Sequence, residues 1–235
     1  MQKQLAEVLK SGGINIDFLL NNSSLQNLTS DFTSKVEVIT KKLEHVQEVI
    51  ESNRKYEIAD NEYHLSVGNG FLVNKEWKKA AHHLEIASLS QPEDWNLHLT
   101  IGICYANIRG GRLTNIKSIE AYTRAIIHIP VIDKEVKGKT YIYRGAMLKR
   151  INKLDEAELD VKFGLSQTKS KRFQSDGLYN LACIYAMRND REELFQVMNK
   201  LKPTNAYMNT IRHHLKDYFK NFENDKEFID FISVT

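Results

Sequence analysis

Apolar residues recur every three or four positions along most of this chain, which is the spacing of one face of an α-helix. In the clearest stripe the spacings alternate between four and three: Phe32, Val36, Ile39, Leu43, Val46 and Ile50. We expect an amphipathic helix here that begins near Asp31. It can be a coiled coil that dimerises the chain, or a helix laid against the segment that follows. Val38 and Val49 widen the stripe and favour the second interpretation.

A repeat follows this stripe. Gly68 and Gly102 are 34 residues apart, and the aromatic residues Phe71 and Tyr105 lie three positions after them. The pairing of a small and a large residue occurs twice more, as Gly145 with Leu148 and as Ala182 with Tyr185. A fixed period of this length predicts an architecture of stacked structural units.

A second landmark lies nine positions after three of the large residues, from Phe71 to Ala80, Leu148 to Ala157 and Tyr185 to Leu194. Nine residues suffice to finish one helix, turn and begin an antiparallel partner. Each turn contains an asparagine, a residue that tolerates the left-handed conformation at helix ends: Asn74, Asn152 and Asn189. A mid-helix glycine costs about 1 kcal/mol relative to alanine. Glycines at equivalent positions therefore predict close approach of the paired helix.

This pattern resembles the tetratricopeptide repeat (TPR). Residues 61–94 match it most fully, with Val67, Gly68, Phe71, Ala80, Leu84, Ala87 and Pro92 in register. Residues 138–171 and 175–208 follow it too, although the last unit has Leu194 where the family has a small residue. The second unit has seven extra residues between Tyr105 and Ala121. They predict a lengthened second helix with a protruding tip after the turn at Gly110–Gly111.

The resemblance implies an all-α fold, an α-solenoid of about four TPR-like helical hairpins with an N-terminal amphipathic helix and C-terminal capping helices. We expect residues 1–60 to form the N-terminal helical segment, 61–208 the four repeats and 209–235 the cap. The cap contains a predicted helical stripe and a second apolar group: Ile211, Leu215, Tyr218, Phe219 and Phe222, then Phe228, Ile229 and Ile232. The segment 221–228 resembles the closing segment of bacterial members, which indicates a bacterial source.

Composition narrows the function. The 33 basic and 30 acidic residues leave a net charge of +3, too balanced to indicate nucleic acid as a partner. No apolar run predicts a signal peptide or a membrane span, so we expect a cytoplasmic protein without a membrane partner. Cys104 and Cys183 each lie in an apolar helical pattern and are predicted to be buried free thiols.

Catalytic and cofactor motifs are absent from the sequence: it has no phosphate-binding glycine loop, no Gly-x-Ser-x-Gly and no His-Glu-x-x-His. None of the eight histidines lie three or four residues apart, so no helix presents two of them on one face for a metal. The lysine-rich segment 169–172 is expected in a solvated turn between repeats. The sequence therefore predicts neither an enzyme nor a metal or cofactor site.

In the TPR family the first helix of each repeat lines a concave groove that binds partners. The resemblance places these residues there: Leu65, Asn69, Leu72, Asn96, Leu99, Ile103, Asn107, Lys139, Ile142, Lys149, Arg150, Tyr179 and Asn180. We expect an apolar floor for a partner's side chains and asparagines for its backbone. The family's carboxylate clamp for chaperone tails does not transfer, because Leu65, Thr100 and Tyr143 replace three of its five positions and only Asn69 and Lys139 fit.

The predicted function is a protein–protein interaction scaffold or adaptor that binds a partner peptide or helix in the groove. A homodimer through residues 31–58 is possible. Two alternatives stay open. The chain can be a peptide-sensing regulatory receptor whose N-terminal helices respond to groove occupancy, or residues 1–58 can fold back and fill the groove themselves.

Overall fold

The structure is a computed structural model that describes residues 11, 23–108, 110–201 and 207–233. Within these ranges the chain is helical and contains no strand. It divides into two compact units, residues 1–59 and 60–235. The all-α fold and the succession of TPR-like hairpins expected from the sequence are confirmed, as is the capped C-terminal end.

The first long helix, α3, runs from Ser23 to Val73. It begins before the expected Asp31 and continues into the first repeat without a break, because neither proline nor glycine occurs between Ser23 and Val67. Its last part, from Asp60, belongs to the second unit and supplies the first helix of the first hairpin.

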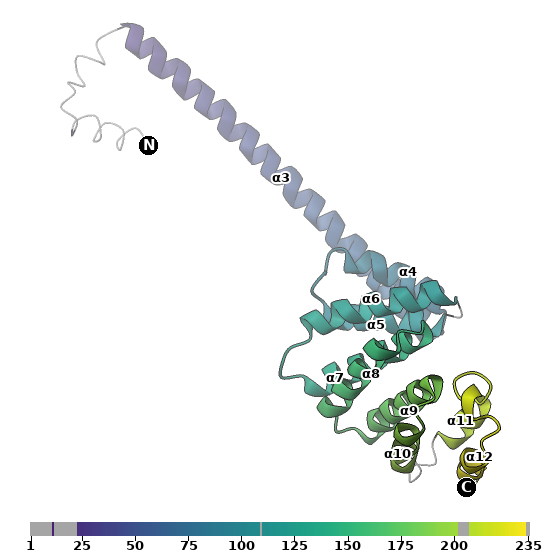
Figure 1. The fold of residues 1–235 in the computed structure, drawn as a ribbon. Helices are drawn as coiled ribbons and strands as arrows, with labels where there is room; N and C mark the ends of the chain where they lie inside the picture. Colours follow the sequence, from purple (N-terminus) through teal and green to yellow (C-terminus); the bar gives the residue numbers. More distant parts are fainter. Residues whose placement is uncertain (1–10, 12–22, 109, 202–206, 234–235) are drawn as a thin grey trace. The chain divides into compact units, whose positions relative to one another are not determined.

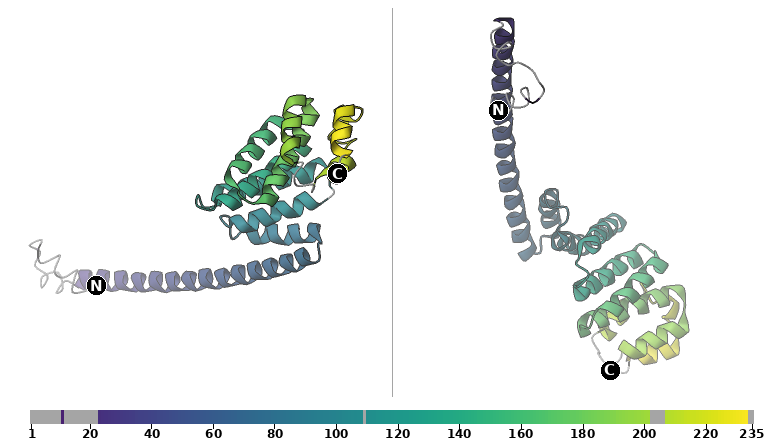
Figure 2. Two further views of the ribbon diagram at one scale, coloured as in Figure 1. Left: turned by 90° about the horizontal axis from the view of Figure 1, so that it is seen from below. Right: turned by 90° about the vertical axis from the view of Figure 1, so that its left-hand side faces the viewer.

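The second unit consists of consecutive helical hairpins (Figures 1 and 2). The end of α3 pairs with α4 (Trp77–Ser88), α5 (Trp95–Asn107) with α6 (Arg112–His128), α7 (Lys134–Arg150) with α8 (Leu154–Gln167), and α9 (Lys171–Arg188) with α10 (Arg191–Leu201). Contacts of α4 with α5, α6 with α7 and α8 with α9 join successive hairpins. The start of α5 has a side-chain cap, because Asp94 accepts hydrogen bonds from the backbone N–H groups of Asn96 and Leu97.

Three hairpin turns share one geometry. The residue four positions after Phe71, Leu148 and Tyr185 has a positive φ in each case: Lys75 at 57°, Asn152 at 64° and Asn189 at 66°. The next backbone N–H then bonds back to the carbonyl of the large residue, for example Lys153 to Leu148 at 3.0 Å. Asn152 and Asn189 confirm the expectation for their turns. Asn74 does not, because the left-handed position falls on Lys75.

The predicted glycine contacts are confirmed. A Cβ at Gly68 would lie 2.8 Å from Leu84 on α4, one at Gly102 2.4 Å from Tyr122 on α6, and one at Gly145 2.6 Å from Val161 on α8. The second hairpin has the predicted longer second helix, since α6 has 17 residues where α4 has 12 and α8 has 14. Gly111, with φ of 71°, precedes its first residue.

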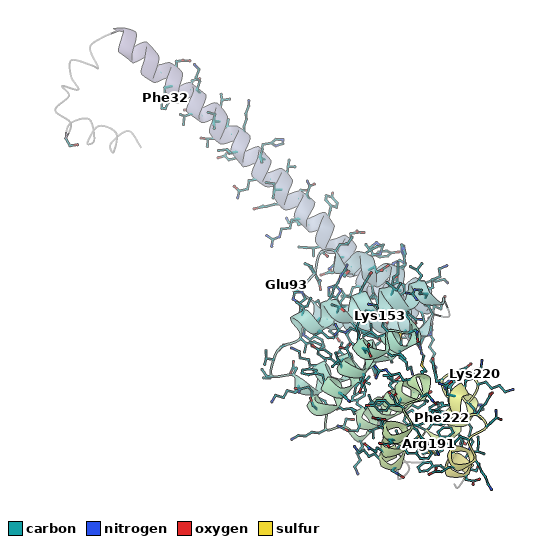
Figure 3. All side chains as sticks on the ribbon, in the orientation of Figure 1. Phe32, Glu93, Lys153, Arg191, Lys220 and Phe222 are labelled. Carbon is teal, nitrogen blue, oxygen red and sulfur yellow. The ribbon has the colours of Figure 1, made fainter. Side chains whose placement is uncertain are left out.

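The C-terminal segment covers the last repeat. It comprises α11 (Met208–His213), the short 3-10 helix η2 (Lys220–Phe222) and α12 (Lys226–Ser233). The predicted single stripe over 211–222 is wrong, because α11 ends at His213 and the chain turns. This turn allows both Phe219 and Phe222 to be buried in one core with residues of α9 and α10. Arg191 of α10 binds Asp225 and Glu227 of the cap; Arg191 and Phe222 are labelled in Figure 3.

Cys104 and Cys183 are buried free thiols, as predicted. Burial raises the pKa of the Cys104 thiol to about 11, which keeps it protonated at neutral pH. None of the helices in the described ranges is long and apolar enough to cross a membrane.

Candidate functional site: an aromatic and basic face

The predicted groove residues divide into three groups by exposure. Asn69, Asn96, Asn107 and Arg150 are exposed. Leu65, Leu72, Ile103 and Lys139 are partly buried. The remaining five are buried: Leu99, Ile142, Lys149, Tyr179 and Asn180.

The buried aliphatic pair changes the expected apolar floor. Leu99 is 3% exposed and packs in a core cluster with Tyr122 and Met147. Ile142 is 0% exposed and fills the space beside Gly164 of α8 and Gly177 of α9. Both residues therefore stabilise the stacking of hairpins and offer no open surface to a partner.

The open part of α7 is a stripe of Lys139, Tyr143, Ala146 and Arg150, which are spaced by four, three and four residues and so share one face. The start of α9 adds Arg172, Phe173 and Asp176. The Tyr143 and Phe173 rings meet edge to face, with centroids 6.2 Å apart. The Lys139 ammonium lies 5.8 Å from the Phe173 ring centroid. Residues of two successive repeats thus meet on one surface.

Tyr207 joins this surface from a distant part of the sequence. Its hydroxyl donates to Oδ1 of Asp176, and its ring stacks on Tyr179 with centroids 5.0 Å apart. The Tyr179 hydroxyl in turn shares a 2.5 Å hydrogen bond with Nδ1 of His214. We call the set Lys139, Tyr143, Arg150, Arg172, Phe173, Asp176 and Tyr207 the aromatic–basic face.

A buried lysine lies beside this face. The Lys149 ammonium donates to Oδ1 of Asn180 at 2.9 Å and lies 4.3 Å from the Tyr218 ring and 5.2 Å from the Tyr179 ring. Burial lowers the pKa of Lys149. No carboxylate pairs with it in the described part of the chain; its partners are the Asn180 amide, the Cys183 thiol and two aromatic faces.

Burial also lowers the pKa of Lys139, and neighbouring Arg172 lowers it further. Glu135 acts in the opposite direction on Lys139, but its carboxylate is engaged by the Thr168 hydroxyl and the Lys169 backbone N–H. These hydrogen bonds lower the pKa of Glu135. The face is therefore a region where several cations lie close together.

Two small clefts lie elsewhere, one between α4, α5 and α6 and one between α6, α7 and α8. In each cleft a basic side chain forms an ion pair with an acidic one. Lys117 in the first cleft lies 3.7 Å from Glu85 and donates to the Tyr105 hydroxyl. Arg144 in the second makes two hydrogen bonds to Asp160. These groups stabilise helix packing, whereas Lys139 and Arg172 of the aromatic–basic face form no ion pair within the described ranges.

Of this face, the groove prediction contained Lys139 and Arg150, and the first-helix positions of the fourth repeat also placed Asp176 in the groove. Tyr143 could have been found from its i+4 spacing to Lys139. Arg172 belongs to the segment 169–172 that was expected in a solvated turn, but α9 begins at Lys171, so Arg172 and Phe173 lie in its first turn. No sequence pattern links Tyr207 to Asp176, because the contact depends on how the C-terminal segment folds back.

The structure resembles the crystal structure of MamA protein, a TPR-like protein, with a TM-score of 0.52. The match covers 73% of this chain and 94% of MamA at 14% sequence identity. No protein-family model matches the sequence, and a comparison with curated proteins yields no significant match. At this identity the likeness establishes the fold alone: the chain forms a TPR-like α-solenoid.

Proposed function

We propose that the protein is an interaction scaffold or adaptor that holds a segment of a protein partner on the first-helix surface, centred on the aromatic–basic face. The observation that carries this proposal is the set of partly buried rings Tyr143, Phe173 and Tyr207 among cations. Tyrosine and arginine dominate the energetics of protein interfaces because they combine apolar area with a polar end.

The exposed asparagines of the predicted groove support the same proposal. Asn69, Asn96 and Asn107 lie on the first helices of the first two hairpins and are exposed. Their amides can pair with a partner's backbone, while the partly buried Leu65, Leu72 and Ile103 contact its side chains. The binding residues that we propose are therefore the exposed and partly buried members of the predicted set, together with the aromatic–basic face.

A photo-crosslinking amino acid at Tyr143, in the protein expressed in its native cells, tests this proposal. We expect a discrete covalent adduct with a partner protein. The matched control is the same amino acid at Leu159, which is 70% exposed and lines the cleft between α6, α7 and α8. Adducts at Leu159 but not at Tyr143 would contradict a first-helix binding surface.

We also infer that residues 31–58 associate with a second copy of the chain. The apolar stripe of this segment is exposed, with Phe32 at 68%, Leu43 at 63% and Ile50 at 60%. Figure 3 labels Phe32, whose side chain projects from α3. A stripe with this alternation of four and three is the seam that coiled coils bury. In this proposal the N-terminal segment 1–60 associates through residues 31–58, residues 61–208 bind the partner and residues 209–235 cap the last repeat.

A further inference from the structure

Arginines in the described ranges differ in whether they form an ion pair with another element. Arg144, Arg188 and Arg191 each bind carboxylates of another helix or of the cap. Arg150 and Arg172, in contrast, form no ion pair within the described ranges, and the same holds for Lys139. Other cations, such as Arg112 and Arg124, also lack an ion pair in these ranges, but Lys139 and Arg172 lie close to each other and Lys139 lies beside the Phe173 ring. Arg150 donates to the backbone carbonyl of Ala106, and no carboxylate of the described residues neutralises its charge.

The same face has little negative charge of its own. Asp176 is its one carboxylate, and the Tyr207 hydroxyl already donates to it. Lys149 lies beneath this surface, where its amine donates to Asn180. Three cations of the face, Lys139, Arg150 and Arg172, therefore stand against one carboxylate that already accepts a hydrogen bond. Arg150 donates to Ala106, whereas Lys139 and Arg172 form no side-chain hydrogen bond within the described ranges and can donate to a bound anion.

The spacing along α7 limits the size of the ligand. Lys139 and Arg150 are 11 residues apart, which corresponds to about 16 Å along a helix. An extended peptide of about five residues spans this distance. Between the two cations lie the Tyr143 ring, which meets Phe173, and the small Ala146, so an apolar side chain has room between the charged ends.

From this arrangement, and resting on the proposed function, we infer that the aromatic–basic face recognises a short extended peptide segment in which two acidic side chains flank an aromatic or aliphatic one. One carboxylate binds Lys139 and Arg172, and the other binds Arg150. A single-stranded nucleic acid fits less well, because Asp176 lies within the face and the basic stretch is short compared with a backbone-tracking groove.

Panning a display library of short random peptides against the full chain tests the inference. We expect enrichment of sequences with two acidic residues around an apolar one. Their affinity, measured by fluorescence anisotropy, should fall about tenfold or more in the Lys139→Glu/Arg172→Glu variant and should weaken with added salt. Lys139→Gln/Arg172→Gln should lower it less, because it adds no repulsion.

The matched control is Lys134→Glu/Lys171→Glu, which makes the same charge change in the first turns of α7 and α9 outside the face. It should keep its affinity. Enriched peptides without acidic residues, or equal losses in both charge-reversal variants, would overturn the acidic ligand and leave the scaffold function standing. Tighter binding of a single-stranded oligonucleotide to the same face would also overturn the inference. No enrichment, together with no crosslink at Tyr143, would overturn both proposals.

Discussion

At the scale of single residues, the fold depends on glycines that let paired helices approach. Gly102 lies against the Tyr122 ring, which is 2% exposed and has no room to move away. Gly70 lies two residues from Gly68 in the same helix, yet a Cβ there would meet nothing within 4 Å. The two positions therefore separate the effect of helix propensity from the effect of packing.

Gly102→Ala should destabilise the protein by about 1–3 kcal/mol, because the added methyl group overpacks the α5–α6 contact. Gly70→Ala should instead stabilise it by about 0.5–1 kcal/mol through helix propensity alone. The denaturant midpoint of each variant, followed by circular dichroism, measures both effects. An equal shift of the denaturant midpoint in the two variants would show that Gly102 is not needed for the close contact between α5 and α6.

At the scale of elements, one buried ion pair joins α7 to α8. The Arg144 guanidinium makes two hydrogen bonds to Asp160, of 2.7 and 2.8 Å, and one of 3.1 Å to the Thr123 hydroxyl on α6. The side chains are only 19% and 10% exposed. The pair thus connects three helices from two successive hairpins, and loss of one partner leaves the other charge largely out of water.

Arg144→Leu should destabilise the protein by about 3 kcal/mol, because Asp160 then remains as an unpaired buried charge. The double variant Arg144→Leu/Asp160→Leu should recover much of this loss. Urea unfolding of both single variants and the double variant gives the coupling energy. The exposed pair Lys153 and Glu156 serves as the control; its removal should cost no more than about 0.5 kcal/mol. A double variant as unstable as Arg144→Leu would refute this role of the pair.

At the scale of the whole molecule, the two compact units have different surfaces. Residues 60–235 have apolar cores within the repeats and beneath the cap, and only some of their large apolar side chains, such as Leu89 and Ile132, are exposed. The described part of residues 30–58 instead carries exposed Phe32, Ile39, Leu43, Val46 and Ile50. In the proposed homodimer a second copy of the same stripe covers these side chains.

Leu43→Lys should weaken self-association by about tenfold or more, because it places an ammonium group in the apolar seam. Ser34→Lys, on the polar side of the same helix, should leave association unchanged. Sedimentation velocity over a range of protein concentrations measures this. A wild-type chain that stays monomeric throughout would rule out the homodimer.

The sequence by itself determined the helical hairpins, their glycine contacts, the lengthened α6 and the presence of a cap. These features depend on local spacing: a large residue four positions before a left-handed turn, or a glycine where helices cross. Two local details were still wrong, since Lys75 rather than Asn74 takes the left-handed position and α11 ends at His213. Equivalent residues are compatible with several turn geometries, and the packing of neighbouring elements selects one.

Only the tertiary structure decided which first-helix residues are open to a partner. Leu99 and Ile142 occupy predicted groove positions, yet they are buried because the next helices pack against them. Tyr207 reaches Asp176, and Tyr218 reaches Lys149, only because the C-terminal segment folds back onto α9. Helical spacing fixes which side of its own helix a residue occupies. How much of that side a neighbouring hairpin covers is a property of the stack, which no local pattern encodes.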